Sequence, residues 1–441
     1  MEEHTSNGRH WATIAFLILL GVPGALIRFS GTHLDPQVES LIFGIGIIAG
    51  AFLLSWAAEV AQIDVSASLA IAVLALIAVM PEYMVEAVLA WDAGESYRAL
   101  ANTDGAVTKE MSLAAANVTG ANRLLIGIGW SAVIITFWLR RRRGFDMRGL
   151  LTLELPMLVV ATLLTLTVAF FKMIPIWLAA VFIGAYIFYL WRSSTQQSVA
   201  PVLHGAAAMI GSFEPLYRRL WVVGLFLYSA AVIIIAAEPF VHGLRSTGEA
   251  LGISEFLLIQ WLAPLASESP EIIVAVLFSL RANPNNGLTT LISSQVNQLT
   301  LLVGSIVLVF SISAGQALNF PLDHFEPDNF FSRIFSEFGL QSSEFLLTAV
   351  VAAFGLLLIS TRVIKLWHGL TLLGIFVAYM MILLLIPDLF GGADDVENVP
   401  LRMWSSVIIV GLAVLMVALN WRRVIYVFKG VPQPGELREG E

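Results

Sequence analysis

The sequence predicts an all-α polytopic membrane protein with about twelve transmembrane helices, arranged as two inverted-topology repeats. Hydrophobic residues make up 58% of its 441 positions and charged residues only 13%, whereas about a quarter of a soluble domain is charged. The hydrophobic residues come in runs of about twenty, the length of a helix that crosses a bilayer. In addition, a Pro-Glu pair recurs inside two of these runs.

The apolar runs give the candidate spans in chain order. All of them should be helices, because a lipid-exposed backbone must satisfy its own hydrogen bonds. The first run follows a polar start that contains Arg9, as a signal peptide does, but no small-x-small cleavage pattern follows it, so we expect a retained span. The expected starts lie near Trp11, Leu41, Leu69, Ser112, Leu150, Ile174, Trp221, Ile253, Leu288, Glu344, Trp367 and Met403.

Lysine and arginine are distributed unevenly between the loops. With a cytoplasmic amino terminus, most of the 24 basic residues fall on the cytoplasmic side, including the cluster from Arg140 to Arg143. The positive-inside rule therefore predicts that both termini are cytoplasmic, in a plasma membrane or bacterial inner membrane. The longest cytoplasmic loop, 192–220, divides the chain into an N-terminal half, 1–191, and a C-terminal half, 221–441.

The strongest internal signal is a repeat in the third and eighth predicted spans. They read ALIAVMPEYMVEAVLAW and APLASESPEIIVAVLFSL, which aligns Glu82 with Glu271. The spans that follow align as well, with Asn117 opposite Gln295. Because the eighth span comes five positions after the third, an odd number, the two repeats should run antiparallel in the membrane, as in many secondary transporters.

Each glutamate of the repeat follows a proline, which indicates a broken helix with polar groups exposed. Proline lacks an N–H and frees the backbone carbonyl one turn earlier. Together with the carboxylates of Glu82 and Glu271, and the amides of Asn117 and Gln295, such carbonyls would form an all-oxygen site that suits Ca²⁺ or Na⁺. One glutamate inside a span could serve only to join helices. Two at matched positions favour a function, because a carboxylate at mid-bilayer is costly.

These residues resemble the alpha repeats of the calcium:cation antiporter superfamily, which includes the sodium/calcium exchangers. The first repeat covers about 64–138 and the second about 253–310. The resemblance implies a ten-helix core in spans two to eleven, with one extra helix at each end. It also implies that Glu82 and Glu271 are the principal calcium ligands, with Asn117 and Gln295 beside them.

The sequence departs from the family's usual G-[ST]-S-x-P-E motif, in which hydroxyls help to bind sodium. The first repeat reads IAVMPE and has none, while the second reads ASESPE, which keeps Ser267 and replaces the next serine with Glu268. Glu86 adds a carboxyl one turn after Glu82 on the same helical face. Weakened sodium sites and extra carboxyl groups that can exchange protons favour a proton-coupled exchanger.

Arg123 lies where the family carries an apolar residue, directly after Asn122. A permanently charged guanidinium inside the bilayer needs a partner, so we expect it to pair with Glu86 or Glu268. Such a network would either lock the helices together or take part in transport.

Other functional classes fit the sequence less well. There is no cysteine, no histidine in the middle of a span, no Gly-rich phosphate loop and no basic tract typical of nucleic-acid binding. We therefore expect no enzyme and no cofactor, with inorganic cations and the lipid bilayer as partners.

The expected function is secondary active antiport of Ca²⁺ against Na⁺ or H⁺, with these cations as substrates. A cation channel would need a continuous polar pore, whereas the polar residues cluster near one depth. An intramembrane enzyme would depend on Ser267 or Ser269 beside Glu268. A monovalent cation/proton antiporter stays open, because Gln295 in place of an acid lowers the negative charge of the site.

Overall fold

In the computed structural model, the part of the chain that is described is almost entirely helical. The described residues are 2–32, 34–61, 63–64, 80–100, 107–147, 153–194, 203, 205–252, 254–323, 338–360, 363–385 and 404–412. Among them, the helices long and apolar enough to cross a membrane cover Gly8–Ser30, Pro36–Ala61, Lys109–Arg141, Glu154–Phe171, Ile176–Ser194, Pro215–Leu251, Glu255–Leu280, Pro284–Ala314, Leu340–Ile359 and Leu366–Leu383. The predicted all-α polytopic membrane fold is thereby confirmed.

Ten of the twelve predicted starts lie close to the start of one of these helices. The other two, near Leu69 and Met403, lie outside the described residues. After each of them a helix is described, α4 (Met80–Ala99) and a helix at 404–412. The total of twelve therefore stays a prediction.

The chain forms two compact units, and each draws on both predicted halves. Unit 1 comprises Met1–Ala121, Pro175–Pro270 and Thr300–Phe320, and unit 2 comprises Asn122–Ile174, Glu271–Leu299 and Pro321–Glu441. The unit boundaries fall inside α5 (Lys109–Leu124), α12 (Ala263–Leu280) and the π-helical segment η3 (Gln298–Leu302). Division into halves at 192–220 stays a prediction. That segment contains α9 (Gly205–Gly211) and the start of α10 (Pro215–Leu251), with 195–202 and 204 outside the described residues.

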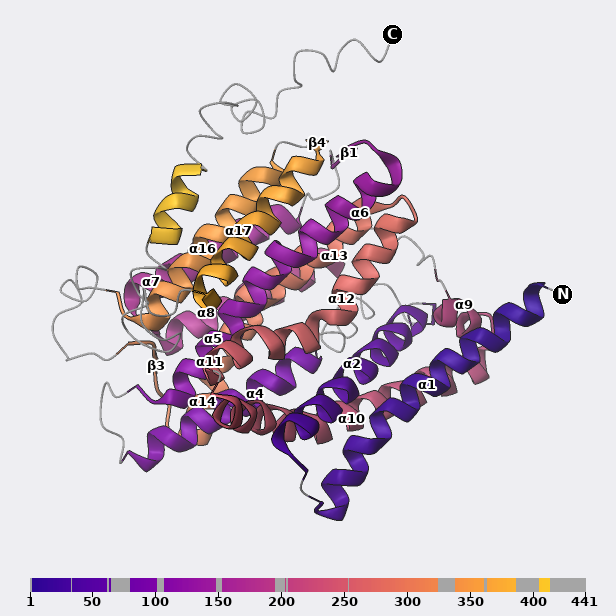
Figure 1. Ribbon diagram of the computed structural model, residues 1–441, viewed down its shortest axis with the longest axis horizontal. Helices are drawn as coiled ribbons and strands as arrows, with labels where there is room; N and C mark the ends of the chain where they lie inside the picture. The colour runs from indigo at the N-terminus through magenta and orange to yellow at the C-terminus, as the bar shows by residue number, and fades with distance from the viewer. Residues whose placement is uncertain are drawn as a thin grey trace, which may run out of the picture. The chain divides into compact units, whose positions relative to one another are not determined.

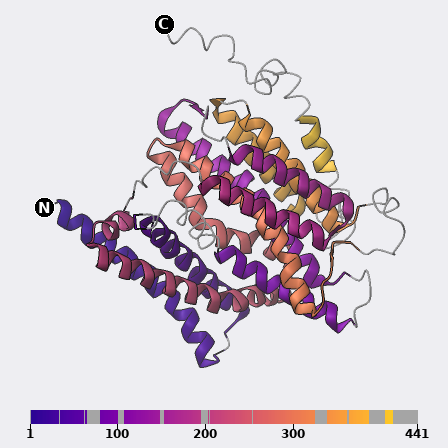
Figure 2. The ribbon, with the colours of Figure 1, turned by 180° about the vertical axis from the view of Figure 1, so that it is seen from behind.

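In unit 1, three helices that are far apart in the sequence lie side by side. Figures 1 and 2 show α10 running along α2 and α1. Glycines permit the close approach, since a Cβ at Gly44 would lie 2.9 Å from the Phe240 ring and one at Gly50 3.1 Å from Ile233. The elements wholly inside this unit are α1 (Glu2–Ser30), α2 (Pro36–Ala61), α4, α8 (Ile176–Ser194), α9 (Gly205–Gly211), α10 (Pro215–Leu251), α11 (Glu255–Leu257), η2 (Leu258–Leu262) and α14 (Val303–Ala314).

Polar contacts join α2 to α10 at both ends. After α2, the Asp64 carboxylate accepts hydrogen bonds of 2.7 and 2.8 Å from Arg218. These bonds, together with a further bond from Arg219, lower the pKa of Asp64 to about 2. At the opposite ends of the two helices, the Ser40 and Thr247 hydroxyls lie 3.1 Å apart. The helix pair is therefore fixed by polar contacts as well as by packing.

In unit 2, α16 packs against α7, and α17 packs against α6 and the π-helical segment η1. Close packing again uses glycine, since a Cβ at Gly127 would lie 2.5 Å from the Phe376 ring. Strands β1 (Phe145–Asp146) and β4 (Val363–Ile364) pair antiparallel. The remaining elements are η1 (Leu125–Trp130), α6 (Ser131–Arg141), α7 (Glu154–Phe171), β2 (Met173–Ile174), α13 (Pro284–Asn297), β3 (Phe320–Pro321, which begins in unit 1), α16 (Leu340–Ile359) and α17 (Leu366–Leu385).

The start of α16 is held by a single carboxylate. Asp323 accepts hydrogen bonds from the backbone N–H groups of Gly339 at 3.1 Å, Gln341 at 3.2 Å and Ser342 at 3.4 Å, and one from the Ser342 hydroxyl. Burial raises the pKa of Asp323, although these hydrogen bonds act in the opposite direction. The side chain satisfies donors at a helix start that would otherwise lack acceptors.

Candidate functional site

Two glutamates of the first predicted repeat lie buried on α4. Pro81 occupies the first turn of this helix, where its missing N–H is tolerated. Glu82 is 3% exposed and Glu86, one turn later, is 2% exposed. The spacing places both side chains on one helical face. Unit 1 therefore presents two neighbouring carboxyl groups that water does not reach.

The amide of Asn117 on α5 binds the second of these carboxylates. Its Nδ2 donates a hydrogen bond of 2.6 Å to Oε2 of Glu86. Within the described part of unit 1, neither Oε1 of Glu86 nor Oδ1 of Asn117 has a hydrogen-bond partner. Sequence analysis identified both residues, and the structure brings them together. Two buried oxygens of this pair are thus available to a further donor or a cation.

Ser267 and Glu268, the predicted residues before the second Pro-Glu pair, also lie in unit 1. Both are buried, and the Ser267 hydroxyl donates to the carbonyls of Ala263 at 3.4 Å and Pro264 at 3.3 Å. Helix α12 continues through Pro270, so the expectation of a helix break at this proline is wrong. The departure from α-helical geometry comes earlier, in η2.

Gln260 in η2 is a buried polar residue that sequence analysis missed. It is fully buried, and neither atom of its amide group has a hydrogen-bond partner in the described part of unit 1. Its backbone carbonyl lies against Gly120 so closely that a Cβ there would overlap the oxygen. Gly120 follows Asn117 by one helical turn, so η2 packs beside the helical face that carries the Glu86 partner. A lone glutamine in an apolar run was the available signal.

Unit 2 contains the other two predicted ligands. Glu271 on α12 is partly buried, and Gln295 on α13 is fully buried. In the described part of unit 2, the amide oxygen and nitrogen of Gln295 have no hydrogen-bond partner, and neither does the hydroxyl of Ser294. Buried amides without partners are rare in proteins. Gln295 is therefore suited to receive a ligand.

Arg123 forms a buried ion pair in unit 2. Its guanidinium contacts the carboxylate of Glu344 on α16, and the two side chains are 3% and 0% exposed. It also donates a hydrogen bond of 3.3 Å to the hydroxyl of Tyr379 on α17. Sequence analysis expected Glu86 or Glu268 as the partner and missed Glu344, because an acid at the start of an apolar run is typical of a span end.

Three π-helical segments lie in the predicted repeats. Segments η1 and η3 fall in the second helix of the first and second repeat, and η2 precedes the Pro-Glu pair of the second repeat. Such segments occur frequently at functional sites. Their positions add to the case that these helices carry the function.

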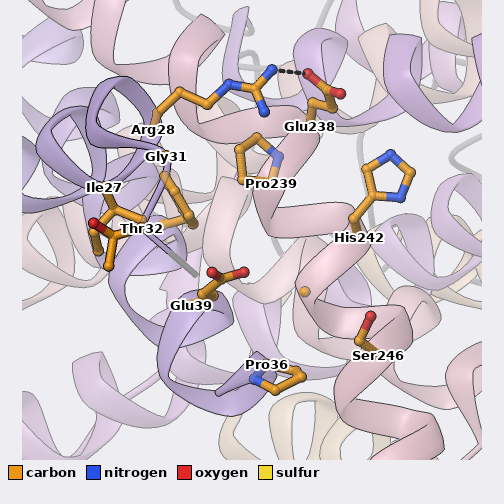
Figure 3. A pocket seen from close by; sticks show the side chains of 12 residues that line it. Ile27, Arg28, Gly31, Thr32, Pro36, Glu39, Glu238, Pro239, His242 and Ser246 are labelled. Atoms are coloured by element: carbon orange, nitrogen blue, oxygen red, sulfur yellow. Dashed lines mark hydrogen bonds and ion pairs between the residues drawn. The ribbon is translucent and has the colours of Figure 1, made fainter. Parts of the chain in front are cut away.

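A separate pocket of about 220 Å³ lies between the end of α1, the start of α2 and the C-terminal half of α10 (Figure 3). Its polar lining includes an ion pair between Arg28 and Glu238, 2.6 Å apart, as well as Glu39 and His242. None of the predicted ligands lines it. No group of three or more His, Cys, Asp or Glu side chains suited to a metal ion occurs in the described ranges. The candidate ligands therefore include amides and hydroxyls as well as carboxylates.

Comparison with known proteins places these residues in a family. A family model described as sodium/calcium exchanger protein matches residues 39–195 and 221–385. Comparison with curated proteins finds no match.

Several solved structures are similar to the chain. One described as the H⁺/Ca²⁺ exchanger CAX shares 32% sequence identity over 96% of this chain and 98% of that one, with a TM-score of 0.80. Native YfkE shares 16% identity over 84% and 97%, with a TM-score of 0.53. The sodium-calcium exchanger NCX_Mj shares 14% over 79% and 98%, with a TM-score of 0.51. The last two similarities concern the fold alone.

The family match covers well over half of the chain, including the helices that bear all seven predicted ligands. The resemblance inferred from the paired Pro-Glu motifs is thereby confirmed. The chain belongs to the sodium/calcium exchanger protein family, and it is a membrane-spanning cation antiporter rather than an enzyme.

Proposed function

We propose that this protein exchanges Ca²⁺ against H⁺ across a plasma membrane or bacterial inner membrane, with both termini in the cytoplasm. The observation that carries the proposal is the second buried carboxyl group on α4, Glu86, one turn from Glu82 and bonded to Asn117. Two carboxyl groups this close and this buried are costly when both are ionised. Proton uptake removes that cost, and a divalent cation removes it as well.

The ligands of the transported Ca²⁺ in this proposal are the carboxylates of Glu82 and Glu271, as the repeat pattern suggests. The amide oxygens of Asn117 and Gln295 would add to the coordination, since Ca²⁺ takes six to eight oxygen ligands. Ser267, Glu268 and Glu86 complete the proposed set. Support comes from the burial of these groups, which is partial for Glu271, and from the amide oxygens that have no partner in the described part of their own units.

Competition for the same carboxyl groups provides the coupling. When Glu86 is ionised, it accepts the hydrogen bond from Asn117; when it is protonated, it is neutral and attracts Ca²⁺ less. Arrival of Ca²⁺ therefore favours proton release, and protonation favours Ca²⁺ release. A similar structure is described as an H⁺/Ca²⁺ exchanger at 32% identity, and the first repeat lacks the hydroxyls before Glu82 that would favour Na⁺.

We further propose that α2 and α10 move together to open the site to one side at a time. The contacts of Asp64 with Arg218 and of Ser40 with Thr247 join the two helices at both ends, and α1 is tied to α10 through Arg28 and Glu238. Helices joined in this way move as one body, as rigid-body alternating access requires.

The test is radiolabelled Ca²⁺ uptake into proteoliposomes, driven separately by an outward proton gradient and an outward sodium gradient. The proton gradient should drive uptake, Glu271→Gln should abolish it, and Glu249→Gln, at an exposed position on α10, should not. Uptake driven by sodium alone would replace H⁺ with Na⁺ as the counter-ion. Absence of uptake under both gradients would favour a monovalent cation/proton antiporter, and uptake without any gradient coupling would favour a channel.

A further inference from the structure

The ion pair between Arg123 and Glu344 is almost completely buried in unit 2. Arginine keeps its charge at any physiological pH, and both side chains are at most 3% exposed. Replacing such a pair with apolar residues often leaves a protein equally stable or more stable. The two charges therefore call for an explanation other than the stability of unit 2.

The groups around the guanidinium are oxygen donors of the kind that bind small cations. Besides the Glu344 carboxylate, the Tyr379 hydroxyl accepts a hydrogen bond of 3.3 Å from Nη1 of Arg123. The ring of Tyr379 also lies under the charge, 5.3 Å from Cζ, in a cation–π geometry. Carboxylate and hydroxyl oxygens are ligands that suit hard cations such as Na⁺.

Helix α16 adds a further oxygen one turn before Glu344. Gln341 is 1% exposed, and its amide has no hydrogen-bond partner in the described part of unit 2. The spacing of three residues places it on the same helical face as Glu344. Thr348, one turn after, is engaged elsewhere, since its hydroxyl donates to the Glu344 backbone carbonyl at 2.8 Å.

The helix that carries Glu344 is anchored just before this residue. Asp323 binds the first turn of α16 through the N–H groups of Gly339 and Gln341, five and three residues before Glu344. A carboxylate on an anchored helix cannot readily turn toward water. It needs a cation or a proton in place, and Arg123 supplies the cation.

We propose that the Arg123 guanidinium is a tethered cation that occupies a monovalent-cation position formed by Glu344 and Tyr379, so that Na⁺ cannot bind there. The inference deepens the proposed function and rests on it for its meaning in transport: a position filled permanently by the protein's own charge removes one way for sodium to act as the counter-ion. Removal of the guanidinium should uncover a sodium site in unit 2.

The test measures the melting temperature of purified full-length protein in NaCl and in N-methylglucamine chloride at equal ionic strength and pH 8. Wild-type protein should melt equally in both salts. Arg123→Gln should melt higher in NaCl by about 2 °C or more, with a saturable dependence on Na⁺ concentration, because a ligand stabilises the folded state that binds it. The double variant Arg123→Gln with Glu344→Gln should lose this response.

A matched control is Arg245→Gln in unit 1. Arg245 also pairs with a carboxylate, that of Asp92, at 3.0 Å, but this pair is partly exposed, at 16% and 18%, so water can solvate the uncovered carboxylate. An equal sodium response in this control would show a general effect of charge removal and overturn the proposal. So would an Arg123→Gln variant that melts equally in both salts, or one that does not fold even in NaCl, since Na⁺ would then fail to replace the guanidinium. The measurement involves no transport, so a failure of Ca²⁺ uptake would leave its result intact.

Discussion

Replacing Gly120 with alanine should weaken the packing of α5 against η2. The new Cβ would overlap the backbone carbonyl oxygen of Gln260, and it would also lie 2.7 Å from Cγ of the same residue. Because the obstacle is backbone, no change of rotamer relieves it, and one helix must shift. Overpacking of this kind costs about 1–3 kcal/mol, whereas the gain from removing a helical glycine is at most about 1 kcal/mol.

The matched control is Gly224→Ala in α10, where an added Cβ meets no atom within 4 Å. The same chemical change should stabilise the protein there by about 0.5–1 kcal/mol. At roughly 1–2 °C per kcal/mol for a chain of this length, Gly120→Ala should lower the melting temperature by about 1–3 °C and Gly224→Ala should raise it by about 1 °C. The assay is thermal unfolding in detergent, followed by tryptophan fluorescence and by retention of the monodisperse peak.

The same substitution should also affect transport. Gly120 lies one turn after Asn117, so a displaced α5 would lengthen the hydrogen bond from Asn117 to Glu86, now 2.6 Å. Ca²⁺ uptake by Gly120→Ala should therefore have a higher KM and a changed pH profile. A variant that melts like Gly224→Ala and transports like the wild type would refute the close contact between α5 and η2.

Three further predictions concern single carboxyl groups. Because the pKa of Asp64 is lowered to about 2 in the folded state against about 3.9 in an unfolded chain, its stabilisation is present above pH 4 and lost as pH falls through 2. Asp64→Asn should thus melt below the wild type at pH 7, by the equivalent of about 1 kcal/mol, with the difference vanishing near pH 2. Glu86→Gln should flatten the pH dependence of proton-driven Ca²⁺ uptake, while Glu249→Gln keeps it; a wild-type profile in Glu86→Gln would count against proton exchange at this residue. Asp323→Asn should destabilise the start of α16 by about 1 kcal/mol, seen as faster hydrogen exchange at Gln341 and Ser342, and unchanged exchange there would argue against the cap.

The fold could be predicted largely because the bilayer imposes a simple rule. Apolar runs of span length predicted the ten long apolar helices of the described residues, and the predicted helix starts differ from the observed ones only by a few residues. Helix α10 begins at Pro215 rather than near Trp221, because its first turns carry Arg218 and Arg219, which face Asp64 instead of lipid. Such a polar helical start cannot be recognised from hydropathy, since its cause is a partner 154 residues away.

The candidate residues could be found from the repeat, but their partners could not. The pattern identified Asn117 and both α4 glutamates, yet it did not say which carboxylate the amide would bind, because Glu82 and Glu86 share one helical face. The pairing of Arg123 with Glu344 joins segments 221 positions apart and leaves no local signal. Pro270 is the opposite case: proline predicts a break in the helix, but α12 continues through this residue.

The contacts between α2 and α10 also determine when the protein can assemble. The partners in the pairs Arg28 with Glu238, Ser40 with Thr247 and Asp64 with Arg218 are separated by 210, 207 and 154 residues. A ribosome adding 5–20 residues per second needs roughly eight to forty seconds to synthesise the intervening chain. During that interval α1 and α2 are in the membrane without α10. The glycines of α2 then lack the α10 side chains that pack against them, and Asp64 lacks its hydrogen bonds from Arg218. Helices α1 and α2 therefore reach their final packing only after α10 has been synthesised, and a chain that ends before Pro215 cannot complete unit 1.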